Sequence, residues 1–133
     1  MSRSLYEQHC QPCIIGTRAM LPENSNKMLA SIPRWKKVQV GGMEQIRREF
    51  HFRDFKEAAA FAHKIGLLAE RENHHPSLLI EWGKVTVSWW THKANGLHPN
   101  DFIMAAKTDL VANNSAVNNS AVNSSAANSI TGN

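Results

Sequence analysis

The sequence predicts an α+β fold, a two-layer sandwich in which a four-stranded antiparallel sheet carries helices on one face. Two pairs of extended segments are each joined by a glycine-containing turn, at Gly41-Gly42 and at Gly83-Lys84, and such turns are a hairpin signal. A long amphipathic helical pattern separates the two pairs, and another follows the second pair. This order, α-β-β-α-β-β-α, favours an antiparallel sheet with its helices segregated to one side.

The first half of the chain is expected to form one short helix and one hairpin. Residues 21–32 have a helical pattern that ends before Pro33, because the residue before a proline is disfavoured in helical conformation. Residues 35–40 and 43–52 are the two extended runs on either side of the diglycine. In the second run every other position from Ile46 to Phe52 is apolar except Arg48, and this alternation indicates a half-buried strand. The alternate positions are Ile46, Arg48, Phe50 and Phe52.

The second half repeats this plan with a longer helix. Asp54 and Glu57 have the spacing of a capping box, and small and apolar residues then recur every three or four positions until about Arg71. Residues 78–82 and 85–91 form the second hairpin, since apolar and polar side chains alternate along the later run.

The chain is expected to contain one domain with an extension at each end. Residues 1–20 form an N-terminal extension, residues 21–112 the folded domain, and residues 113–133 a low-complexity tail of Asn, Ser and Ala. The domain ends with a helix that begins at Pro99, a residue favoured at the first helical position. The tail has almost no large apolar side chains, so it cannot offset the entropy of ordering and is predicted to be disordered.

Composition favours a soluble protein in the cytoplasm. Of the 133 residues, 42% are apolar and 20% are charged, and no apolar run approaches the roughly 20 residues that a membrane helix needs. Glu7 interrupts the stretch where a signal peptide would be apolar. The net charge is +4, but the basic residues are scattered and form no dense stripe, so nucleic-acid binding is not expected.

Two cysteines and a histidine lie together in the N-terminal extension, in the motif HCQPC at residues 9–13. Cys10 and Cys13 could provide half of a zinc site or a redox pair, but no second CxxC or HxxxH completes a set of four ligands. In a reducing compartment free thiols are the more common state. We therefore expect no metal here.

The most informative residues are three histidines. His74 and His75 follow the long helix directly and precede Pro76, which holds them on a rigid corner. His92 shares parity with Ser88 and Trp90 and is expected at the end of the last strand, where it can converge on the other two. Imidazole has an unperturbed pKa of about 6.5, so it can both donate and accept a proton near neutrality. Three further histidines are interpreted as surface or structural residues: His51, His63 and His98.

At these residues the chain resembles the pterin-4a-carbinolamine dehydratase family. The resemblance is carried by ENHHP at 72–76, Trp82, VTVSWWTHKANGL ending at residue 97, and Asp101. It extends to IPRW at 32–35 and FHFRDFKEA at 50–58, and so covers roughly residues 21–111. The family has a four-stranded antiparallel sheet with helices on one side, and it forms dimers and tetramers without a metal or other cofactor.

The resemblance also implies a set of site residues. The family's histidines carry over onto His74, His75 and His92 as catalytic residues, and Glu70 and Asp101 would orient their imidazoles. Asn73 stands where many family members have an aspartate. Three residues are candidates for contact with the substrate: Trp35, Asn73 and Thr91. Of these, Trp35 could equally be a core residue.

The implied reaction is the loss of water from a 4a-hydroxy-tetrahydropterin, which gives the quinonoid dihydropterin. This step would support the recycling of tetrahydropterin for an aromatic amino acid hydroxylase such as phenylalanine hydroxylase. The alternative is a non-enzymatic role, because members of the family also resemble dimerisation cofactors that bind a homeodomain transcription factor. In either role we expect a homodimer or homotetramer.

Overall fold

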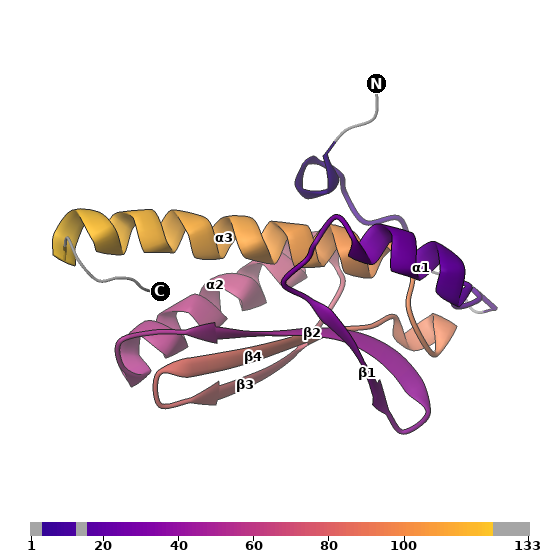
Figure 1. The fold of residues 1–133 in the computed structure, drawn as a ribbon, viewed down its shortest axis with the longest axis horizontal. Coiled ribbons are helices and arrows are strands. Elements are labelled where there is room, and N and C mark those ends of the chain that lie inside the picture. Colours follow the sequence, from indigo (N-terminus) through magenta and orange to yellow (C-terminus); the bar gives the residue numbers. More distant parts are fainter. Residues whose placement is uncertain (1–3, 13–15, 124–133) are drawn as a thin grey trace.

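The computed structural model describes residues 4–12 and 16–123, and it confirms the predicted α+β order of three helices and four strands (Figure 1). Two short 3-10 helices, η1 and η2, are added to that order. Along the chain the elements are η1 (Leu5–Glu7), α1 (Pro22–Leu29), β1 (Lys36–Val40), β2 (Met43–His51), α2 (Phe55–Glu72), β3 (Ser77–Glu81), β4 (Lys84–Trp89), η2 (His92–Ala94) and α3 (Pro99–Asn123).

The four strands form one antiparallel sheet in the order β1-β2-β4-β3. Each hairpin is a pair of sequence neighbours, and the second strand of each hairpin lies in the middle of the sheet, where β2 pairs with β4 from Ile46 opposite Trp89 to His51 opposite Lys84. All three helices lie on the same side of the sheet (Figure 1). The other face has no covering element in the described chain.

Local signals in the sequence explain where the elements begin. The Asp54 carboxylate accepts the backbone N–H of Glu57 at 2.9 Å and so caps the start of α2, as expected. In the first hairpin Gly41 and Gly42 both have positive φ, 58° and 81°, a conformation that glycine adopts without steric cost. The chain can therefore reverse within two residues between β1 and β2.

The core lies between the sheet and the helices. One face of β2 and β4 contributes apolar side chains, and α2 and α3 bury their apolar stripes against it. The two rings of Phe50 and Phe61 have centroids 4.9 Å apart, so β2 and α2 are in direct aromatic contact. The largest fully buried apolar side chains are Trp89, Phe61, Phe102, Ile46, Ile65, Leu97, Met104, Val85 and Val87.

The end of the last strand differs from the prediction. β4 ends at Trp89, and His92 opens η2 and is not part of the strand. The cause is a tight loop in which the Thr91 N–H donates to the Gly96 carbonyl at 2.8 Å. Asn95 makes this reversal feasible because it adopts the left-handed conformation, with φ of 54°, which asparagine tolerates better than most residues.

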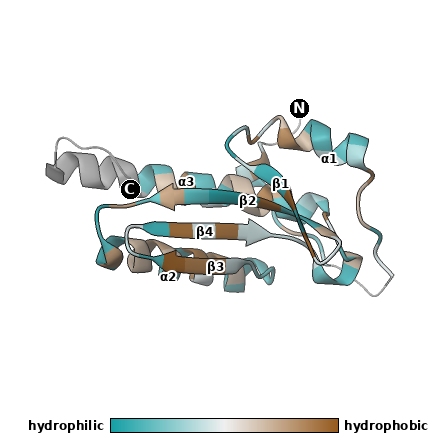
Figure 2. Ribbon diagram, turned by 60° about the horizontal axis from the view of Figure 1, so that its bottom comes forward, coloured by the Kyte–Doolittle hydropathy of each residue, from teal (hydrophilic) through white to brown (hydrophobic). Residues whose placement is uncertain are grey.

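The outer strand β3 exposes large apolar side chains. Leu79, Ile80 and the adjacent Trp82 are 55%, 38% and 74% exposed, and the apolar colouring of β3 is visible in Figure 2. Large exposed apolar side chains on an edge strand are typical of a protein–protein contact. Among the described residues no helix is both long enough and apolar enough to cross a membrane.

The helix α3 continues beyond the predicted end of the domain to Asn123. The last core residue is Ala112, and the tail's final ten residues, 124–133, lie outside the described residues. The disorder of residues 113–133 stays a prediction.

Removing residues 113–133 is expected to change the melting temperature little, because the described core ends at Ala112 and a segment without apolar anchors adds little stability. Circular dichroism melts of the full chain and of the truncated chain measure this. A decrease of more than about 4 °C, which corresponds to roughly 1 kcal/mol for a domain of this size, would show that the tail packs on the domain.

Candidate active site

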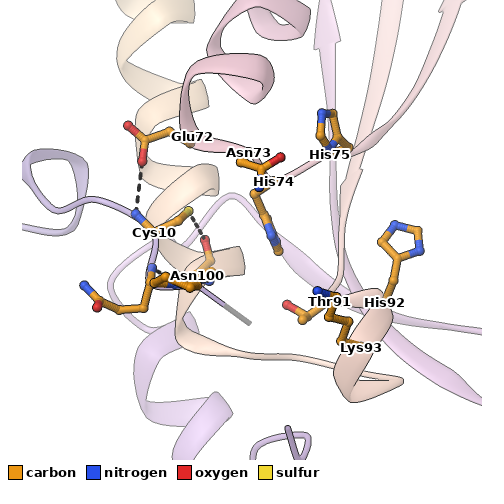
Figure 3. Close-up of a pocket in the computed structure, with 11 residues that line it drawn as sticks. Cys10, Glu72, Asn73, His74, His75, Thr91, His92, Lys93 and Asn100 are labelled. Atoms are coloured by element: carbon orange, nitrogen blue, oxygen red, sulfur yellow. Dashed lines mark hydrogen bonds between the residues drawn. The ribbon is translucent and has the colours of Figure 1, made fainter. Parts of the chain in front are cut away.

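A pocket of about 400 Å³ opens where four segments of the chain meet: the end of α2, the loop after β4, the start of α3 and the N-terminal extension (Figure 3). All three predicted catalytic histidines contribute to its wall. The residues that line it are Cys10, Gln11, Pro12, Glu72, Asn73, His74, His75, Thr91, His92, Lys93 and Asn100.

The end of α2 holds the histidine pair in place. Asn73 follows the helix in left-handed conformation, with φ of 53°, which is a common way to end a helix. The His74 N–H then donates back to the Ala69 carbonyl at 3.1 Å. Many family members have an aspartate at this position. Asparagine tolerates the left-handed conformation well, and this conformation reverses the chain so that the His74 backbone bonds to the last turns of α2.

His74 is the buried member of the three and is held by Asp101. Its Nε2–H donates to Asp101 Oδ1 at 2.6 Å, and its ring stacks on Trp89 with centroids 5.9 Å apart. Asp101 is completely buried and also accepts the Thr91 hydroxyl and the His98 N–H, both on Oδ2 at 2.9 Å. Three donors thus satisfy this carboxylate, which is the condition for burying it as a charge.

The other two histidines are exposed, and each has a different neighbour. The His75 Nε2–H donates to Glu70 Oε2 at 2.5 Å, one helical turn earlier on α2. The His92 ring packs against Trp90 with centroids 4.6 Å apart. The pocket therefore contains one buried imidazole with a buried carboxylate and two solvent-facing imidazoles.

The three residues predicted to bind substrate have different positions. Asn73 and Thr91 line the pocket, and the Thr91 hydroxyl is engaged by Asp101. Trp35 does not line it. The Trp35 indole is 3% exposed in the core, lies edge-on to Phe50 and donates to Asp109 at 2.9 Å. Its position fits the alternative of core packing.

Sequence reasoning missed the part of the wall that comes from the N-terminal extension. Residues 4–12, which we call the N-terminal strap, run along the start of α3 and bring Cys10, Gln11 and Pro12 to the pocket. Their partners on the body of the protein, Glu72 and Asn100, were also missed. Only the HCQPC motif marked this segment in the sequence, and the sequence analysis considered it as half of a zinc site or a redox pair and expected no metal there.

The described part of the chain contains no group of three or more His, Cys, Asp or Glu side chains arranged to hold a metal ion. The Cys10 thiol donates to the Asn100 carbonyl at 3.9 Å, and Cys13 lies outside the described residues. The pocket wall offers three imidazoles, the Glu72 carboxylate, the Cys10 thiol, the Lys93 amine, the Thr91 hydroxyl and side-chain amides.

The family model for pterin 4 alpha carbinolamine dehydratase matches residues 18–111. The chain belongs to the pterin-4a-carbinolamine dehydratase family. Relatives named for this dehydratase include one from Photobacterium profundum and one from Saccharophagus degradans, each 49% identical. The alignments cover 80% and 79% of this chain and 95% and 93% of those proteins.

A solved structure has the same fold. It is a transcriptional coactivator/pterin dehydratase from Brucella melitensis, 32% identical, with a TM-score of 0.64 over 71% of this chain and 98% of that one. The resemblance that the histidine motif indicated is thus confirmed for the family and for the fold.

In this pterin-4a-carbinolamine dehydratase family member, His98 is a structural residue, as the sequence analysis interpreted it. Its Nδ1 accepts the backbone N–H of Asn100 at 3.0 Å at the start of α3. Burial lowers the pKa of His98, and this effect and the nearby His74 outweigh the opposite influence of Asp101. A neutral imidazole is required for this acceptor role.

The lowered pKa of His98 predicts a pH-dependent stability. The unfolded chain takes up a proton as the pH falls through about 6.5, whereas the folded chain does so only at lower pH. The stabilisation is therefore complete above about pH 6.5 and decreases as the pH falls from there toward the folded pKa. Thermal melts between pH 7.5 and 5.5 are expected to show a falling melting temperature in the wild type and a smaller slope in His98→Asn.

The matched control is His63→Asn, which changes an exposed histidine on α2 in the same way. It is expected to keep the wild-type slope. Equal slopes in the wild type and in His98→Asn would contradict the assignment of His98 as a partly buried neutral acceptor.

Proposed function

We propose that this chain catalyses the dehydration of a 4a-hydroxy-tetrahydropterin to the quinonoid dihydropterin and water. The observation that carries the proposal is the pocket itself: three imidazoles line one cavity, and two of them are each held by their own carboxylate. Membership of the family, together with relatives named for this dehydratase, supports the pterin as the substrate.

The chemistry requires two proton movements. The C4a–O bond breaks as the hydroxyl takes up a proton and leaves as water, and N5 loses its proton as the C4a=N5 double bond forms. Hydroxide is a poor leaving group, so a protonated imidazole beside the hydroxyl and a neutral imidazole near N5 would each accelerate the reaction by roughly 10² to 10⁴. We assign these transfers to His74 and His92, and we assign His75 to binding the polar edge of the pterin.

The hydrogen bonds at the site support this division. Because Asp101 accepts the Nε2–H of His74, the exchangeable position on that ring is Nδ1, and the carboxylate fixes the tautomer and the ring orientation. Glu70 does the same for His75, so Glu70 and Asp101 are positioning residues in the mechanism. Asn73 and Thr91 contribute the wall between the two histidine-bearing segments.

The proposed reaction uses no cofactor, because elimination of water moves protons and no electrons to or from the protein. Its product would be reduced back to tetrahydropterin, which links the chain to an aromatic amino acid hydroxylase such as phenylalanine hydroxylase. We place this activity in the cytoplasm.

The exposed apolar residues of β3 and of the turn after it, namely Leu79, Ile80 and Trp82, support self-association as a homodimer or homotetramer. The measurement is multi-angle light scattering on the purified chain. The same surface supports a second candidate function, a dimerisation or coactivator module, because the solved relative from Brucella melitensis is described as a transcriptional coactivator as well as a dehydratase.

Stopped-flow decay of 4a-hydroxy-tetrahydropterin, recorded with and without the protein, separates the two candidate functions. A decay rate that rises in proportion to protein concentration is the expected result. No acceleration at micromolar protein would reject the dehydratase and leave the binding module.

The histidine variants test the mechanism. His74→Ala and His92→Ala are expected to lower kcat by roughly 10-fold or more, because each loses general acid or base assistance in the transition state. His75→Ala is expected to raise KM more than it lowers kcat, as for an interaction that binds substrate and transition state about equally. Steady-state kinetics beside circular dichroism provides both measurements.

Two outcomes would contradict this assignment. Wild-type kinetics in all three variants would remove the histidines from the mechanism. Loss of the folded signal in His74→Ala, the only buried member of the three, would show that the contact of His74 with Asp101 serves the fold; His92→Ala, on an exposed side chain, would then decide the catalytic role.

A further inference from the structure

The N-terminal strap is bound to the body of the protein through its backbone and through one side chain. The Cys10 N–H donates to Glu72 Oε1 at 3.0 Å, and the Tyr6 carbonyl accepts Lys107 Nζ at 3.0 Å. The His9 Nδ1–H donates to the second Glu72 oxygen at 2.9 Å. One carboxylate at the end of α2 thus holds two successive residues of the strap.

A further attachment is a two-point contact with Asn100. Its side chain is 1% exposed in the described chain, its Oδ1 accepts the Gln11 N–H at 2.9 Å, and its Nδ2 donates to the Gln11 carbonyl at 2.7 Å. An amide that pairs with both backbone groups of one residue fixes the position and the orientation of that residue. Gln11 is therefore held in register with the start of α3.

The charge on Glu72 strengthens the attachment. Burial raises the pKa of Glu72, but the hydrogen bonds from Cys10 and His9 and the charge of Lys107 outweigh this and hold the pKa below its ordinary value. The carboxylate is therefore ionised at neutral pH, and hydrogen bonds to a charged acceptor are stronger than those between neutral groups.

The strap and the histidines bound the pocket from opposite sides. In Figure 3, Cys10 and Asn100 lie on one side of His74, whereas His75 and His92 lie on the other. We propose that the N-terminal strap is a positioning element for the pterin: it supports the ring on the side away from the exposed histidines, so that its docking sets substrate affinity and not proton transfer. This inference rests on the proposed function.

Two features of the strap argue for a role at the site beyond simple packing. It is bound by polar contacts to Glu72 and Asn100. These two residues also line the pocket, so the residues that hold the strap are part of the pocket wall. The family model begins at residue 18, so the strap lies outside the segment that defines the family. The strap thus adds to the pocket wall three residues that the matched segment does not supply: Cys10, Gln11 and Pro12.

The test uses two variants that release the strap in different ways in the full-length chain. Asn100→Ala removes both hydrogen bonds to Gln11. Lys107→Met removes the bond to Tyr6 and a charge 4.0 Å from Glu72 without altering a residue of the pocket wall. The matched control is Lys84→Met on β4, where the lysine pairs with Glu81 and Glu49 on the hairpin side.

Three readouts are measured for each variant: kcat and KM for 4a-hydroxy-tetrahydropterin, the Kd of unreactive 7,8-dihydropterin by fluorescence titration, and deuterium exchange of a peptide that contains the Cys10 and Gln11 amides. Both strap variants are expected to exchange faster at these amides. Kd and KM are expected to rise by roughly 10-fold in Asn100→Ala and roughly 3-fold in Lys107→Met, with kcat within about 2-fold of wild type. Lys84→Met is expected to match the wild type in all three.

Several results would overturn the proposal. Faster exchange with unchanged Kd and KM would make the strap a packing element only, and unchanged exchange would show that these contacts do not hold it. A fall in kcat as large as the fall in kcat/KM would place the strap in the chemical step. A wild type that binds dihydropterin without turnover would reject the proposed function but leave the Kd test of the strap decisive, whereas a wild type that binds no dihydropterin would reject both.

Discussion

The site depends on one buried carboxylate. Asp101 has no exposed surface, and it joins three separate segments: the His74 ring after α2, the Thr91 hydroxyl after β4 and the His98 N–H before α3. Breaking such a buried charged network by removing one partner typically costs about 3–5 kcal/mol, which is a large share of the 5–15 kcal/mol that stabilises a typical domain. The geometry of the pocket and the stability of the fold are therefore coupled through Asp101.

The position of Asp101 follows from the helices that meet there. It lies in the first turn of α3, where the unpaired N–H groups of a helix favour a negative charge. His74 and His75 follow the end of α2, where the unpaired carbonyls favour donors and positive charge. The two helix ends thus offer complementary environments to a carboxylate and to imidazoles. The fold brings both helix ends to the same end of the sheet, where β4 ends and β3 begins.

Local patterns predicted the elements, and five of the eleven residues that line the pocket were among the predicted site residues: Asn73, His74, His75, Thr91 and His92. Periodicity and the Asp54 cap located α2 correctly, and the glycine turns located both hairpins, because these signals depend on near neighbours. The strap was not predicted because its contacts join residues far apart in the chain, such as Gln11 with Asn100, and a hydrogen bond to a backbone group requires no particular side chain on the strap. The turn at His92 was missed for a related reason: alternation continues past Trp89, while the Thr91–Gly96 contact that ends the strand has no periodic signal.

The three histidines of the pocket differ in burial and therefore in how firmly their rings are held. His74 is fixed on both sides, by Asp101 at its edge and by Trp89 on its face, so it cannot adjust to a ligand. His75 and His92 are exposed, with Glu70 bonded to the first and Trp90 packed against the second, so their rings are less enclosed than that of His74. In the proposed reaction the pterin would therefore align with His74, the ring that the protein holds most firmly. The most buried polar contact of the site therefore holds His74, the most enclosed of the three histidine rings.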